Sequence, residues 1–139
     1  MSAMVDMVQS DVSDDNFRSP DIVAKIVQAN KSYTERGYFA TAWSKQWDNL
    51  KTGGDKKFEV NMHVGEVISF LAVCGKGCTD LDLRVADGAG HEVGADTGDD
   101  AIPIVGFTAR TEGTYTVQVI MKACAAAACP IGVKAYMKN

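Results

Sequence analysis

The chain has 139 residues, of which 46% are hydrophobic and 23% charged, and its formal net charge is −4. A chain of this length suits one domain that buries its own core without a metal or a partner. It has no apolar run near the ~18 residues of a membrane span and no basic stripe. We therefore expect neither a membrane-spanning segment nor a nucleic-acid partner.

Residues 1–18 combine four aspartates with scattered apolar residues. Neither a helical nor a strand period runs through them, so we expect a flexible acidic tail. The first ten residues carry Asp6 and lack the basic start and apolar stretch of a signal peptide. Exported proteins are often produced without their signal, so this does not argue for the cytoplasm.

A helix is predicted from Pro20 to about Arg36, because Ser19-Pro20 is a typical helix start and apolar residues then recur at helical spacing as far as Gly37. Beyond that glycine, aromatic and apolar residues again fall three or four apart: Phe39, Trp43, Trp47 and Leu50. We therefore expect a helical segment over residues 19–52, with a second short helix or a broken continuation packed on a sheet.

From Lys57 the apolar period changes to two, which is the period of a half-buried strand. Seven strands without intervening helices are expected in the domain 53–139, near 58–62, 67–74, 81–85, 91–95, 102–110, 115–121 and 131–137. This regular spacing predicts a mainly β fold, an antiparallel two-sheet sandwich of jelly-roll type with the N-terminal helix packed on it.

The four cysteines form two local pairs, Cys74 with Cys78 and Cys124 with Cys129. An even number in close pairs indicates disulfides. A zinc site is the alternative, but four residues separate the second pair and neither loop resembles a zinc knuckle. Of the three possible connectivities we favour the two local bridges, because glycines flank Lys76 and permit a tight loop. Persistent disulfides indicate a periplasmic or secreted protein.

Acidic residues concentrate between residues 80 and 100. Side chains two apart on a strand share a face, and a loop that folds back would bring further carboxylates to the same place. Ca²⁺ takes six to eight oxygen ligands in irregular geometry. The candidate ligands are Asp80, Asp82, Asp96, Asp99 and Asp100. The alternative is a solvated acidic edge that discourages pairing between sheets.

No catalytic constellation stands out. His63 and His91 lie in or beside expected turns, and neither has a partner that suggests a triad. Nucleophile-elbow, zinc-protease and phosphate-loop motifs are absent from the sequence. We therefore predict no enzyme, exposed loop positions for both histidines, and no cofactor apart from the candidate calcium ion.

Several short motifs within residues 58–137 match a known type of domain: Val73-Cys74, Thr79 to Leu83, Asp87-Gly88, Gly113 to Val117, and the pair Cys124/Cys129. With these motifs the segment resembles the bacterial pre-peptidase C-terminal domain, a small jelly-roll sandwich of secreted proteins, and in particular its cysteine-bearing exported versions. The usual domain is an appendage to a protease, whereas none is attached here. The resemblance implies binding or secretion rather than catalysis, and related collagen-binding modules bind calcium.

Together these features predict an exported, non-catalytic binding or adhesion module with an envelope protein or a glycan as its partner. Binding could depend on calcium. The alternative is a structural or accessory domain for secretion or stability that has no ligand of its own.

Overall fold

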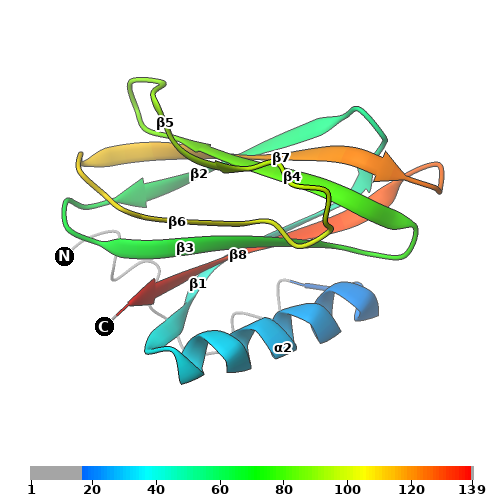
Figure 1. The fold of residues 1–139 in the computed structure, drawn as a ribbon, viewed down its shortest axis with the longest axis horizontal. Coiled ribbons are helices and arrows are strands. Elements are labelled where there is room, and N and C mark those ends of the chain that lie inside the picture. The colour runs from blue at the N-terminus through cyan, green and yellow to red at the C-terminus, as the bar shows by residue number, and fades with distance from the viewer. Residues whose placement is uncertain (1–16, 139) are drawn as a thin grey trace.

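The computed structural model describes residues 17–138, so the expected acidic tail lies, except for its last two residues, outside the described part. Two four-stranded antiparallel sheets face each other, and one helix packs against the outer face of one sheet (Figure 1). The predicted two-sheet sandwich with an N-terminal helix is confirmed. It has eight strands rather than the seven expected.

The elements follow one another in the order α2 (Pro20–Glu35), β1 (Tyr38–Leu50), β2 (Asp55–Met62), β3 (Val67–Cys74), β4 (Cys78–Ala86), β5 (Glu92–Asp96), β6 (Ile104–Thr108), β7 (Gly113–Cys124) and β8 (Cys129–Lys138). Strands β1-β8-β3-β6 form the helix-covered sheet, and strands β2-β7-β4-β5 form what we call the open sheet. Strand β8 therefore lies between β1 and β3. The connections from β3 to β4 and from β7 to β8 each cross from one sheet to the other.

Helix α2 docks through the residues that the helical spacing singled out. Ile22, Ile26 and Tyr33 are buried against apolar side chains of β3 and β8. The Tyr33 ring stacks on Tyr136 with centroids 4.0 Å apart, and its hydroxyl lies 2.6 Å from the Ser69 hydroxyl. The helix is thus held by apolar burial together with a buried hydrogen bond.

The expected helical continuation after Gly37 is wrong, because residues 38–50 form the long strand β1, which pairs with β8. Its register shifts twice, between Ala40 and Ser44 and again between Trp47 and Leu50. A bulge adds a residue to one strand, so core-facing side chains need not fall two apart. Phe39 and Trp43 pack on the core, and their spacing of four residues fits one face of a strand as well as of a helix. Trp47, by contrast, is 40% exposed. The sandwich therefore begins at Tyr38 rather than at residue 53.

Strand β3 is buried on both faces, in keeping with its continuous apolar sequence. Phe70 and Ala72 belong to the main core between the sheets, whereas Leu71 and Val73 pack beneath the helix. On β7 of the open sheet only alternate side chains are fully buried. The open sheet therefore presents a second, polar face outward.

Candidate functional site

Both predicted disulfides are present, Cys74–Cys78 and Cys124–Cys129, so no cysteine among the four is left for zinc. Each bridge joins the end of a strand in one sheet to the end of a strand in the other. The bridges are neighbours, because Cys78 and Cys124 are register partners on β4 and β7. Stable disulfides of this kind favour an exported location.

The outer face of the open sheet carries a hollow of about 700 Å³. Its lining comes from all four strands and from the β4–β5 hairpin: Lys57, Glu59, Arg84, Val85, Ala86, Asp87, Gly88, Gly90, Glu92, Thr114, Thr116 and Gln118. No aromatic ring occurs in this described lining. The hollow can therefore recognise a ligand through hydrogen bonds and charges, but not through ring stacking.

The strand register explains the shape of the hollow. Lys57 of β2 and Arg84 of β4 are both register partners of Gln118 on β7, so these three side chains form one row across the sheet. In the next row Glu59 and Ala86 are both partners of Thr116. The middle of the hollow thus has the short side chains of threonine and alanine, and longer charged side chains flank it.

Neighbouring residues orient several of the polar groups around the hollow. Arg84 Nη1 lies 2.8 Å from Glu92 Oε1 in an exposed ion pair. The Gln118 side-chain amide donates to Asp55 Oδ2 at 2.8 Å. Exposed pairs of this kind add little stability, but they limit the rotamers that each side chain samples. The polar face is therefore partly pre-organised.

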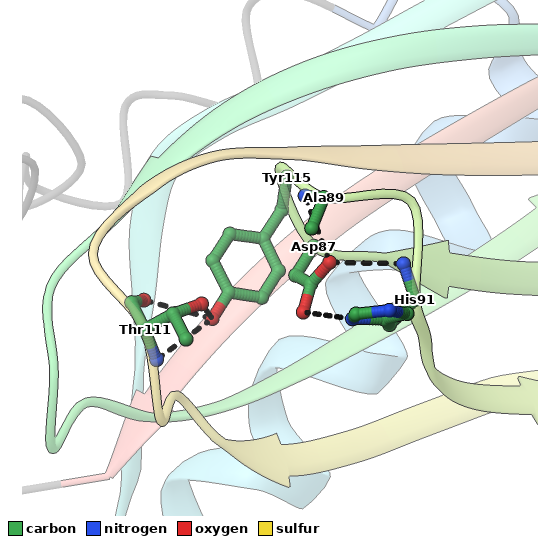
Figure 2. Close-up of polar contacts among 5 residues, drawn as sticks. All are labelled: Asp87, Ala89, His91, Thr111 and Tyr115. Atoms are coloured by element: carbon green, nitrogen blue, oxygen red, sulfur yellow. Dashed lines mark hydrogen bonds and ion pairs between the residues drawn. The ribbon is translucent and has the colours of Figure 1, made fainter.

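Asp87 holds the hairpin that forms one side of the hollow. Its Oδ1 accepts hydrogen bonds from the backbone N–H groups of Ala89, at 3.0 Å, and His91, at 2.9 Å (Figure 2). Asp87 also lines a second hollow of about 600 Å³, on which Tyr115 lies with its hydroxyl donating to the Thr111 carbonyl. With Oδ1 engaged by the backbone, we assign Asp87 a structural role in the hairpin.

The two histidines lie apart from the hollow's floor. His91 is on the hairpin and exposed, with Nδ1 3.8 Å from Asp87 Oδ2. His63 Nδ1 lies 2.5 Å from Glu112 Oε2 in the turn region before β3. Both contacts are ion pairs when the imidazole is protonated.

The structure brings together part of the acidic set that the sequence suggested. Asp80 and Asp82 lie on β4, and the loop 97–101 passes beside them, because the Leu81 N–H donates to the Asp100 carbonyl at 3.0 Å. Asp82 is only 6% exposed. The Oδ1 atoms of Asp80 and Asp82 are both buried and have no hydrogen-bond partner among the described residues.

The other three aspartates of that set are placed differently. The Asp96 carboxylate accepts hydrogen bonds from the backbone N–H groups of Gly98 and Ile104. Asp100 Oδ1 accepts a hydrogen bond from the backbone N–H of Ile102. Asp99 is exposed. Within residues 17–138 no three or more Asp, Glu, His or Cys side chains are grouped so that they could hold a metal ion. The five candidate ligands are therefore not gathered into one cluster.

Burial raises the pKa of the Asp82 carboxyl above its ordinary value of 3.8. The Asp80 charge also raises this pKa, and Asp96 adds to the effect, whereas Lys122 and Arg84 oppose it. The negative charge on Asp82 is thus destabilised where it stands.

The sequence predicted the disulfides but not the hollow, because no motif marks its lining. A signal was present in the outward positions of the alternating strands, such as Lys57 and Glu59 on β2 and Thr116 and Gln118 on β7. Whether these side chains lie together depends on strand order and register, which one sequence does not specify.

In the described part of the chain, helix α2 is too short and too polar to cross a bilayer.

Neither a family model nor a curated protein sequence matches the chain. Several solved structures are similar to it. The pre-peptidase C-terminal domain of a collagenase from Bacillus anthracis is 8% identical with a TM-score of 0.51, over 67% of this chain and 87% of that one. PliG of Aeromonas hydrophila, a periplasmic inhibitor of g-type lysozyme, is 18% identical with a TM-score of 0.47, over 68% and 86%.

A third similar structure is the carbohydrate-binding module CBM51 from Clostridium perfringens GH95, in complex with methyl-galactose. It is 11% identical with a TM-score of 0.42, over 66% of this chain and 79% of that one. At 8% identity, the collagenase domain shows a similar fold and nothing about function. The chain is therefore a β-sandwich similar in fold to a pre-peptidase C-terminal domain, as the sequence resemblance implied.

Proposed function

We propose that this chain is an exported, non-catalytic binding module that holds a glycan in the hollow of the open sheet. The observation that carries this proposal is the hollow itself, which is about 700 Å³ in volume and lined by hydroxyl, amide, carboxylate, ammonium and guanidinium groups. Sugars present many hydroxyl groups that both donate and accept hydrogen bonds, and this lining offers partners of both kinds.

A glycan fits this lining better than a protein surface does. Protein interfaces are anchored by a few buried aromatic, apolar or arginine side chains. The described lining has no aromatic ring, and its arginine, Arg84, is already paired with Glu92. A ligand here must be recognised by dispersed polar contacts, so we expect modest affinity per sugar unit.

The carboxylates of the hollow favour binding over hydrolysis. Glycosidases place two carboxyl groups about 5–10 Å apart across the scissile bond. Glu59 lies on β2 and Glu92 on β5, at opposite edges of the sheet, so their backbones are about 14 Å apart at the usual strand spacing. Arg84 also engages Glu92. Asp87, the third carboxylate of the lining, is engaged by the hairpin backbone. This arrangement supports a binding role.

A glycan array followed by calorimetric titration tests the proposal. We expect the wild-type protein to bind a subset of envelope or matrix glycans, and we expect Thr116→Trp to weaken binding at least tenfold, because the indole fills the middle of the hollow. Lys31→Ala, on the exposed side of helix α2, is the matched control and should bind normally.

Two results contradict the proposal. One is a folded wild-type protein that binds no glycan on a broad array, which would favour an accessory domain without a ligand. The other is a Thr116→Trp protein, folded by circular dichroism, whose affinity equals that of the wild type.

A further inference from the structure

Two neighbouring side chains on β4 each bury a carboxylate oxygen that nothing in the described structure satisfies. They are Oδ1 of Asp80 and Oδ1 of Asp82. An unsatisfied buried polar atom is rare in a folded protein, because it loses its water without gaining a partner. Here two such atoms come from one strand, two residues apart, so the cost of burial is joined by repulsion between like charges.

The charges of Lys122 and Arg84 act on Asp82, but neither side chain forms an ion pair with it. The side-chain ion pairs of residues 17–138 include neither Asp80 nor Asp82. Arg84 follows on the same face of β4 but pairs with Glu92. A positive group from outside the described structure would offset both the desolvation and the repulsion.

Strand β4 is also irregular at Asp80. The register between β4 and β7 shifts on both sides of Asp80. Such bulges re-aim a side chain and are common beside functional sites. The Leu81 N–H is meanwhile bonded to the Asp100 carbonyl, so the loop 97–101 lies beside the pair.

We propose that Asp80 and Asp82 bind one calcium ion through their buried Oδ1 atoms, with backbone carbonyls and water completing the shell. The donor set is oxygen only, because all four cysteines are in disulfides and both histidines contact other carboxylates. Calcium accepts carbonyl and water ligands in irregular geometry, whereas magnesium demands a tight octahedron. Asp96 and Asp100 shape the loop through backbone hydrogen bonds and need not be ligands.

This inference goes beyond the proposed glycan binding and does not rest on it. The ion would lie beside the hollow, because Arg84, a lining residue, is next on the same face of β4 after Asp82. Loss of glycan binding would leave the calcium site untouched, and calcium can be measured without any glycan.

The test uses chelator-treated protein, with calcium alone as the probe, followed by thermal melting and calorimetry. A ligand that binds only the folded state stabilises it with the logarithm of its concentration. We expect the melting temperature to rise by about 3–5 °C at ten times the dissociation constant, and less with magnesium. Asp82→Asn and Asp80→Asn should each remove most of the shift and of the binding heat.

Asp99→Asn is the matched control, because it removes one exposed charge from the same acidic region and should keep the full shift. No binding heat and no shift at millimolar calcium would overturn the inference. An equal loss of the shift in Asp99→Asn would overturn it as well, because the ion would then bind the exposed loop.

Discussion

The two sheets of this sandwich have the same number of strands but differ in what lies on their outer faces. Helix α2 packs against β1, β3 and β8, and both β3 and β8 bury nearly every side chain. Strand β7 of the open sheet fully buries only alternate side chains. The fold therefore uses both faces of the helix-covered sheet but only one face of the open sheet. The remaining face can carry polar groups at little cost to stability.

The largest loss of stability is expected when a charge is placed between the helix and the sheet that it covers. Ile26 is fully buried between α2 and the helix-covered sheet, and Ile26→Asp should lower the free energy of unfolding by more than about 3 kcal/mol, because the carboxylate has no partner there. The next residue, Val27, is 54% exposed. Val27→Asp should therefore cost less than about 1 kcal/mol. Urea denaturation measures both, and equal losses would mean that the helix is not docked as described.

A smaller effect is expected from the bridges that join the two sheets. Replacing Cys124 and Cys129 together by alanine should cost about 2 kcal/mol, because so short a loop restricts the unfolded chain only modestly. Cys74→Ala with Cys78→Ala should cost a similar amount. Denaturation midpoints of the two double variants measure this, and hydrogen exchange should increase first at the disulfide end of β4 and β7. Unchanged stability in both variants would show that packing alone holds the sheets together.

The sequence predicted the helix, the bridges and seven of the strands, because each leaves a local signal. Apolar side chains at helical spacing predicted α2, and alternation predicted strands such as β7. The sequence could not predict β1, because residues four apart, such as Phe39 and Trp43, share one face of a helix and also one face of a strand. Nor could it predict the hollow, because the row Lys57, Gln118 and Arg84 is assembled by pairing between strands far apart in the chain.

The smallest expected effect is a pH dependence specific to the open sheet. The folded-state pKa of Asp82 lies above the unfolded value of 3.8, so the folded protein binds this proton more tightly than the unfolded chain does. In calcium-free buffer, stability should therefore decrease as the pH rises through the folded pKa, and the loss should be complete above it.

Asp82→Asn removes the carboxyl that titrates, so the stability of the variant lacks this pH dependence. The difference in melting temperature between wild type and variant should therefore shrink as the pH falls towards 4, where the wild-type carboxyl becomes neutral. Melting curves between pH 4 and pH 7 measure it. A constant difference across this range would mean that Asp82 is not destabilised by its surroundings.

The central place of β8 in the helix-covered sheet has a consequence for how the protein is made. Strand β8 is the last strand described, yet β1, β3 and the helix all pack or pair against it. Strands β1 and β3 therefore have no shared neighbour within their sheet until β8 has been synthesised. The open sheet, whose four strands all precede β8 in the chain, can pair before the helix-covered sheet is complete. Premature termination within β8 should yield a product for proteolysis rather than a smaller working module.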